Sequence, residues 1–201
     1  NTKLSLELGG NAPVIITPDI NVEALAKSSV IAKLRNAGQV CVAPQRFFVH
    51  ERIYDQFLSI ATDTIKNIKV GYGWDADTNM GPLINQRQQQ QVLHIIEDAK
   101  HGGAAATSGN IPSDKGWFVA PTILTNVDAQ TEAVNKEIFG PVLPIIKWEN
   151  KNDVIEWANN TPYGLASYVW TNNLNDAFFY SEALEFGMVG VNEWAPHATE
   201  A

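Results

Sequence analysis

The sequence predicts an α/β fold: one three-layer domain over residues 1–201, with a mostly parallel twisted sheet between two layers of helices. Two observations support this prediction. Short apolar or β-branched runs alternate with stretches of helical spacing along the whole chain, which is typical of parallel sheets with helices on both faces. The chain also has no internal repeat, low-complexity tract or linker-like segment, so a single domain is the simplest interpretation.

The elements follow from local patterns. Apolar and β-branched composition marks the expected strands at residues 14–17, 46–50, 104–107, 142–148, 167–171 and 188–192. Apolar residues at helical spacing predict a first helix from about 22 to 35, and further helices near 53–65, 86–100, 152–159 and 175–185. Asp19 is expected to cap the first helix. Residues 71–82, rich in Gly, Asp, Asn and Pro, are expected to form a loop.

Composition indicates a globular protein and argues against several classes of partner. The chain is 45% hydrophobic and 18% charged, as soluble domains are. The net charge of -8 disfavours nucleic acid or a membrane, since both attract clustered Lys and Arg. The single cysteine excludes an internal disulfide, and with four scattered histidines it gives no expectation of a metal site. A lone cysteine fits a reducing, cytoplasmic location.

Cys41 is the first candidate for chemistry. The predicted helix before it ends near residue 35, and Gly38 suits a left-handed cap, so Cys41 should lie on a turn before the strand at 46–50. Turns at the ends of strands carry many functional residues. A free cysteine is also among the most buried residue types. The spacing by itself therefore leaves both a nucleophile and a buried thiol open.

Glu7 is the second candidate, because it interrupts the otherwise apolar run at residues 4–8. Burial raises the pKa of a carboxyl group, and a raised pKa suits a general base that works near neutral pH. The alternative is an outward-facing position, since residues 5 and 7 alternate with leucines. No glycine-rich dinucleotide or phosphate-loop motif accompanies either candidate.

Considered together, the segments resemble the aldehyde dehydrogenase superfamily. The glutamate motif of that family resembles residues 6–13 (LELGGNAP), and its cysteine motif resembles residues 36–41 (NAGQVC). Four further segments resemble the family in the family's order: 80–84 (MGPLI), 118–122 (FVAPT), 137–142 (EIFGPV) and 160–165 (NTPYGL). The resemblance covers essentially the whole chain, and six motifs in order make coincidence a poor explanation.

The resemblance implies a mechanism. The Cys41 thiolate would attack an aldehyde, and hydride transfer to NAD or NADP would leave a thioester that Glu7 hydrolyses by activating water. The cofactor-binding residues implied by the resemblance are Glu137, Phe139, Gly9 and Leu8, and Asn192 is implied in the wall of the substrate site. A parent enzyme of this family is expected to be a homo-oligomer.

The resemblance also implies missing parts. The oxyanion asparagine and most of the cofactor site of this family lie in an N-terminal domain, and a C-terminal oligomerisation segment follows the catalytic domain. The chain has no initiator Met and starts beside an apolar strand, which suggests a piece of a longer protein. We therefore expect the isolated chain to have little or no dehydrogenase activity.

Arg35 carries the expectation about substrate. Semialdehyde dehydrogenases resemble this chain in having arginine at this position, where its fork binds the distal carboxylate of the substrate. A surface arginine that interacts with a helix C-terminus is the alternative. We expect a substrate such as succinate semialdehyde. We also expect four further residues to line the substrate pocket: Val40, Val42, Trp194 and His197. A broad-specificity aldehyde dehydrogenase, a cysteine-dependent hydrolase and a catalytically silent structural domain remain as rivals.

Overall fold

The computed structural model describes residues 3, 6, 8–112 and 115–194. Its strands form one sheet in the order β3-β4-β5-β2-β1-β6-β7. All neighbouring strands pair in parallel except β3 and β4. The strands are β1 (Ala12–Ile16), β2 (Pro44–His50), β3 (Ala105–Ser108), β4 (Thr122–Thr125), β5 (Val142–Trp148), β6 (Ala166–Trp170) and β7 (Met188–Val191).

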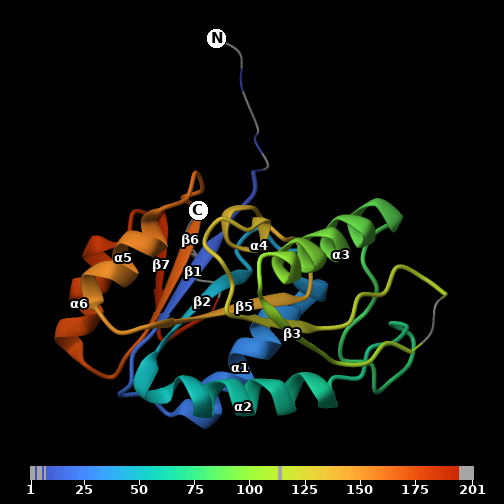
Figure 1. Ribbon diagram of the computed structural model, residues 1–201, viewed down its shortest axis with the longest axis horizontal. Coiled ribbons are helices and arrows are strands. Elements are labelled where there is room, and N and C mark those ends of the chain that lie inside the picture. The colour runs from blue at the N-terminus through green and yellow to red at the C-terminus, as the bar shows by residue number, and fades with distance from the viewer. Residues whose placement is uncertain (1–2, 4–5, 7, 113–114, 195–201) are drawn as a thin grey trace.

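Helices cover both faces of this sheet, so the predicted three-layer α/β fold is confirmed (Figure 1). One face packs against α1 (Val22–Leu34), α2 (Glu51–Asn67) and α3 (Gln86–His101), and the other against α5 (Lys151–Asn159) and α6 (Leu174–Ala183). A 3-10 turn, η1 (Arg35–Gly38), follows α1, and the short α4 (Glu132–Asn135) precedes β5. Within the described residues, no helix is long and apolar enough to cross a membrane.

The central strands explain why the sheet lies inside the molecule. Every residue of β1 is buried, and β2 is buried up to His50. Strands that are covered on both faces carry continuous apolar runs, because neither face meets water. Val14 and Ile16 pack with α1 and α2, whereas Ile15 between them packs with α5 and α6.

Three details differ from the sequence-based expectations. Asn21, not Asp19, caps α1, and its side chain accepts a hydrogen bond of 3.0 Å from the Ala24 amide. Asp19 instead joins the ends of β1 and β6 by accepting from the Asn172 amide at 2.9 Å. The pattern did not predict β4 and α4, although it did predict β3 and β7, which have four residues as well. Short elements of this kind depend on neighbours distant in sequence, which a local pattern cannot register.

One buried cation ties strands and helices together. The fully buried Arg46 side chain donates to the Asn11 carbonyl from Nε at 3.1 Å and from Nη2 at 3.0 Å. It also donates to the last turn of α5, to the carbonyls of Trp157 at 2.9 Å and Ala158 at 2.8 Å. Carbonyls at a helix C-terminus lack partners within the helix and carry partial negative charge. Burial lowers the pKa of Arg46 to about 10, so the guanidinium is charged at neutral pH.

Replacing this guanidinium should destabilise the fold. Arg46→Met leaves the buried carbonyls of Asn11 and Ala158 and the partly buried carbonyl of Trp157 without their donor, so we expect the free energy of unfolding to fall by about 3 kcal/mol. Urea unfolding of the chain measures this loss. Arg52→Met, at an exposed position on α2, is the matched control and should unfold close to wild type. Equal urea midpoints for the two variants would contradict this role of Arg46.

Candidate active site

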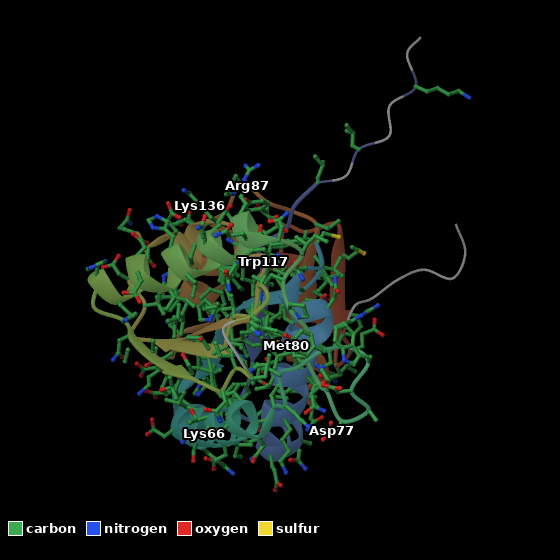
Figure 2. The ribbon with its side chains drawn as sticks, turned by 90° about the vertical axis from the view of Figure 1, so that its right-hand side faces the viewer. Lys66, Asp77, Met80, Arg87, Trp117 and Lys136 are labelled. Atoms are coloured by element: carbon green, nitrogen blue, oxygen red, sulfur yellow. The ribbon has the colours of Figure 1, made fainter. Side chains whose placement is uncertain are left out.

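The candidate residues gather where the parallel strands begin. Gly10 precedes β1, Cys41 precedes β2, the loop that carries Glu137 precedes β5, and Leu165 precedes β6. Because these strands are parallel, their amino ends meet at one edge of the sheet. In Figure 1 this is the upper edge, and in Figure 2 Arg87 and Lys136 lie at the same end. Most open α/β sheets bind ligands at the opposite, carboxyl edge.

A left-handed turn carries the chain from α1 to Cys41, as the sequence predicted. The backbone φ angles are 50° at Asn36, 54° at Ala37 and 77° at Gly38. A Cβ on Gly38 would lie 2.1 Å from the Gly140 carbonyl oxygen, so only glycine fits there. Left-handed Asn and Ala cost about 1 kcal/mol each. Two reciprocal hydrogen bonds hold the turn closed: the Asn36 side-chain amide donates to the Gln39 carbonyl at 3.0 Å, and the Gln39 side-chain amide donates to the Asn36 carbonyl at 3.1 Å.

Cys41 itself is partly exposed, so it is not the buried thiol of the alternative interpretation. Its backbone carbonyl lies directly against Gly10, where an added Cβ would come within 2.1 Å of the carbonyl oxygen. Since both partners are backbone groups, neither side could yield by a side-chain rotation. The glycine pair before β1 and the cysteine turn before β2 are thus packed backbone to backbone.

The carboxylate of Glu137 lies over the same glycine pair. The Gly10 amide donates to Glu137 Oε1 at 2.8 Å, and a Cβ on Gly9 would lie 2.5 Å from Glu137 Oε2. The structure therefore brings together Gly9 and Glu137, two of the residues expected to bind a cofactor. Leu8, which precedes them, is 69% exposed. Glu7, the expected general base, lies outside the described residues.

Two glutamines hold the loop that carries Glu137. Gln45 donates to the Lys136 carbonyl at 2.7 Å and accepts from the Ile138 amide at 2.9 Å, so it brackets Glu137 on both sides. Gln88 of α3 donates to the Phe139 carbonyl at 3.0 Å, and Phe139 is partly buried with a left-handed φ of 49°. The sequence pattern did not point to either glutamine. The available signal was a polar residue near the start of a buried strand, where Gln45 is the second residue of β2.

Four of the expected wall residues surround one hollow, which we call the Arg35 hollow. It has a volume of about 90 Å³ and is lined by Ala32, Arg35, Val40, Val42, Ala43, Pro44, Tyr168 and Trp194. Tyr168 donates its hydroxyl to the Val42 carbonyl, and the Tyr168 and Trp194 rings lie 5.4 Å apart. A larger hollow of about 750 Å³ shares Arg35 and Trp194 with it. Arg35 is exposed, and no carboxylate pairs with it among the described residues.

Two expected wall residues do not join this group. Asn192 follows β7 at the carboxyl edge of the sheet, where it accepts from the Thr171 amide at 3.0 Å and donates to the Thr171 carbonyl at 2.8 Å. These bonds fasten the ends of β6 and β7, and neither of the hollows that Arg35 lines includes Asn192. His197 lies outside the described residues.

Comparison with known proteins bears on this arrangement directly. The family model described as the aldehyde dehydrogenase family matches residues 1–201. Succinate-semialdehyde dehydrogenase [NADP(+)] 2 of Schizosaccharomyces pombe is 44% identical over 94% of the chain and 39% of its own length. Succinate semialdehyde dehydrogenase of Acinetobacter baylyi is 40% identical over 95% of the chain and 40% of its own length.

Solved structures agree with the sequence comparison. Succinate-semialdehyde dehydrogenase from Burkholderia pseudomallei superposes with a TM-score of 0.93 at 38% identity, over 99% of this chain and 42% of that one. An NADP-dependent enzyme of Escherichia coli superposes with a TM-score of 0.92 at 36% identity, over 97% of this chain and 41% of that one. The chain thus spans about two fifths of these relatives. On the family match, the relatives and the fold, the chain belongs to the aldehyde dehydrogenase family.

Proposed function

We propose that this chain supplies the catalytic centre of an NAD(P)-dependent aldehyde dehydrogenase whose substrate carries a second, carboxylate end, such as succinate semialdehyde. The observation that carries the proposal is the placement of Cys41. Its backbone carbonyl packs against Gly10, whose amide binds Glu137, and its sequence neighbours Val40 and Val42 line the Arg35 hollow. The cysteine turn is therefore in contact both with the expected cofactor residues and with the hollow of the expected substrate residues, although Cys41 itself does not line that hollow.

Cys41 is the nucleophile in this proposal. Its thiolate forms a bond to the aldehyde carbon, and the resulting oxyanion is stabilised by backbone and side-chain donors. The bound nicotinamide supplies an acceptor for the hydride of that carbon, which leaves a thioester on Cys41. Glu7 then takes a proton from water, the hydroxide attacks the thioester, and the sulfur leaves as the carboxylic acid forms.

The residues beside Cys41 fit the nicotinamide end of a dinucleotide. Glu137 Oε1 is occupied by the Gly10 amide, and Oε2 accepts no hydrogen bond from the described residues, so it can accept from ribose hydroxyls. The absence of a side chain at Gly9 leaves room for this carboxylate. Phe139, two residues along the same loop, offers an apolar ring, and Leu8 offers an exposed apolar side chain.

Arg35 is the residue that we propose for substrate choice. It lines both hollows beside the cysteine turn, and its planar guanidinium matches a carboxylate with two parallel hydrogen bonds. The names of the Schizosaccharomyces and Acinetobacter relatives, both semialdehyde dehydrogenases, support this choice. His50 gives no support to a cysteine-dependent hydrolase, because it ends β2 and so lies at the far end of that strand from Cys41.

Catalysis by Cys41 and Glu7 can be separated by kinetics. In the full-length polypeptide that contains this chain, Cys41→Ala should abolish NAD(P)H formation from succinate semialdehyde, because no thioester can form. Glu7→Gln should still release one equivalent of NAD(P)H in a rapid burst, followed by turnover slowed by about a hundredfold or more. Stopped-flow absorbance measures both. Substrate hydrolysis without NAD(P) would favour the hydrolase and contradict the proposal.

The backbone contact between Gly10 and Cys41 gives a second prediction. Gly10→Ala must displace the Cys41 carbonyl, and a shift of about 1 Å should lower kcat by about a hundredfold. It should also slow alkylation of Cys41 by iodoacetamide. Gly73→Ala is the matched control, because a Cβ there meets nothing within 4 Å. Wild-type kcat in Gly10→Ala would show that the contact does not position the thiol.

Substrate choice is tested at Arg35. Arg35→Leu should raise KM for succinate semialdehyde by about tenfold or more, since a charge-assisted hydrogen bond is lost, and leave KM for an unbranched aliphatic aldehyde nearly unchanged. Arg35→Lys should fall between, because lysine keeps the charge without the bidentate fork. Steady-state kinetics with both aldehydes measures the difference. Equal changes for the two substrates would assign Arg35 a purely structural role.

A further inference from the structure

Lys33 is a buried cation that the mechanism above does not use. It lies in the last turn of α1 with its side chain fully buried. Its ammonium has no hydrogen-bond partner among the described residues. Such groups are rare, because a buried ammonium without partners loses its hydration and gains nothing in return. Ser29, one turn earlier on the same face, also has a buried hydroxyl without a partner among the described residues.

Burial of this ammonium opposes its charge. Desolvation lowers the pKa of Lys33 to about 7, and the carboxylate of Glu137 acts in the opposite direction and raises it. Replacing a buried charge by an apolar side chain of similar length is often neutral or stabilising. Packing alone therefore gives no reason for lysine at this position, and the charge itself calls for an explanation.

The end of α1 adjoins the loop that carries Glu137. Gly38, in the turn that follows α1, lies against the Gly140 carbonyl, and Gln88 and Val92 of α3 hold the same loop from another side. The Glu137 carboxylate is thus fixed by one backbone bond, from Gly10 at 2.8 Å. Lys33 contributes positive charge from within the protein at the side where α1 ends.

We propose that Lys33 is a positioning residue, whose buried charge keeps the Glu137 carboxylate drawn inward onto the Gly10 amide. The same contact places the carboxylate over Gly9, at the proposed cofactor end of the site. Only this last consequence rests on the proposed function. The proposed effect on Glu137 rests on the burial of Lys33, on its lack of a hydrogen-bond partner among the described residues, and on the packing of the turn after α1 against the loop that carries Glu137.

Other ionisable groups near Lys33 and Gly10 could also affect the pH titration, and they determine which control variants are needed. α1 packs against α2, β2, β5 and η1. Two ionisable side chains on these elements are buried. Tyr54 donates its hydroxyl to the Ile145 carbonyl, and Arg46 donates to backbone carbonyls. Arg35 of η1 is exposed. At the Gly10 end, the titratable groups among the described residues are Cys41, Glu137 itself and Tyr163, whose hydroxyl accepts from the Glu137 amide at 3.4 Å.

The amide of Gly10 reports the position of Glu137 without any enzyme assay. In ¹⁵N-labelled full chain, the Gly10 proton resonance should shift with a midpoint near pH 7, as Lys33 loses its charge. Its hydrogen exchange should be protected below that pH. In Lys33→Met the shift should vanish and the protection should fall by about fivefold, the size of a coupling between neighbouring residues. Cys41→Ser should keep the titration, which separates Lys33 from the thiol.

Matched variants separate charge from packing. Ser29→Ala removes the neighbouring buried polar group on the same face and should leave the Gly10 resonance as in wild type. Lys33→Gln is a second neutral variant, for use if Lys33→Met does not fold, and should behave as Lys33→Met does. A Gly10 resonance that titrates unchanged in the neutral variant, or that does not titrate in wild type, overturns the proposal.

The consequence for the cofactor is measured in the full-length polypeptide. Lys33→Met should raise KM for NAD(P) by about fivefold and change kcat less, whereas a structural role alone would lower the amount of active enzyme without changing KM. If the polypeptide has no dehydrogenase activity, the proposed function fails, and the Gly10 titration still decides the role of Lys33. An unchanged KM in active Lys33→Met enzyme excludes any effect of Lys33 on the cofactor.

Discussion

The site depends on the network of buried polar side chains at the amino edge of the sheet. Arg46 joins the start of β1 to the end of α5, and Gln45 beside it donates to Asn11 Oδ1 at 2.7 Å and brackets Glu137. Consecutive residues of a strand point to opposite faces, so β2 serves both layers from one place. The backbone groups of the loops before parallel strands have no hydrogen-bond partners within the sheet. The side chains of Arg46 and Gln45 provide these partners.

Strain and close packing accompany this network. The cysteine turn contains two non-glycine residues in left-handed conformation, and glycines at 10 and 38 admit backbone contacts that any side chain would block. Such conformations persist only where the surroundings over-determine them, and they gather at functional sites. A rigid sheet edge that fixes the turn from several sides is suited to hold a nucleophile in one position.

The end of α1 presents two cations to two different environments. Lys33 is buried on the side of Glu137, whereas Arg35, two residues later, is exposed beside the hollows. Residues two apart on a helix do not share a face, so one helix end can serve both the proposed cofactor side and the proposed substrate side. Cys41 lies in the segment that joins this helix end to β2.

Local patterns in the sequence determined the fold class, most of the helices and central strands, the turn before Cys41, and the family. Periodicity and glycine placement are local, and the order of the motifs can be followed along the chain without knowing which segments meet in space. Only the tertiary structure decided the antiparallel edge at β3, the bond from Gly10 to Glu137, the carbonyl partners of Arg46, the burial of Lys33 and the position of Asn192 away from the hollows. Each of these joins residues far apart in the chain, and the packing of the sheet, which no local pattern encodes, determines which of them meet.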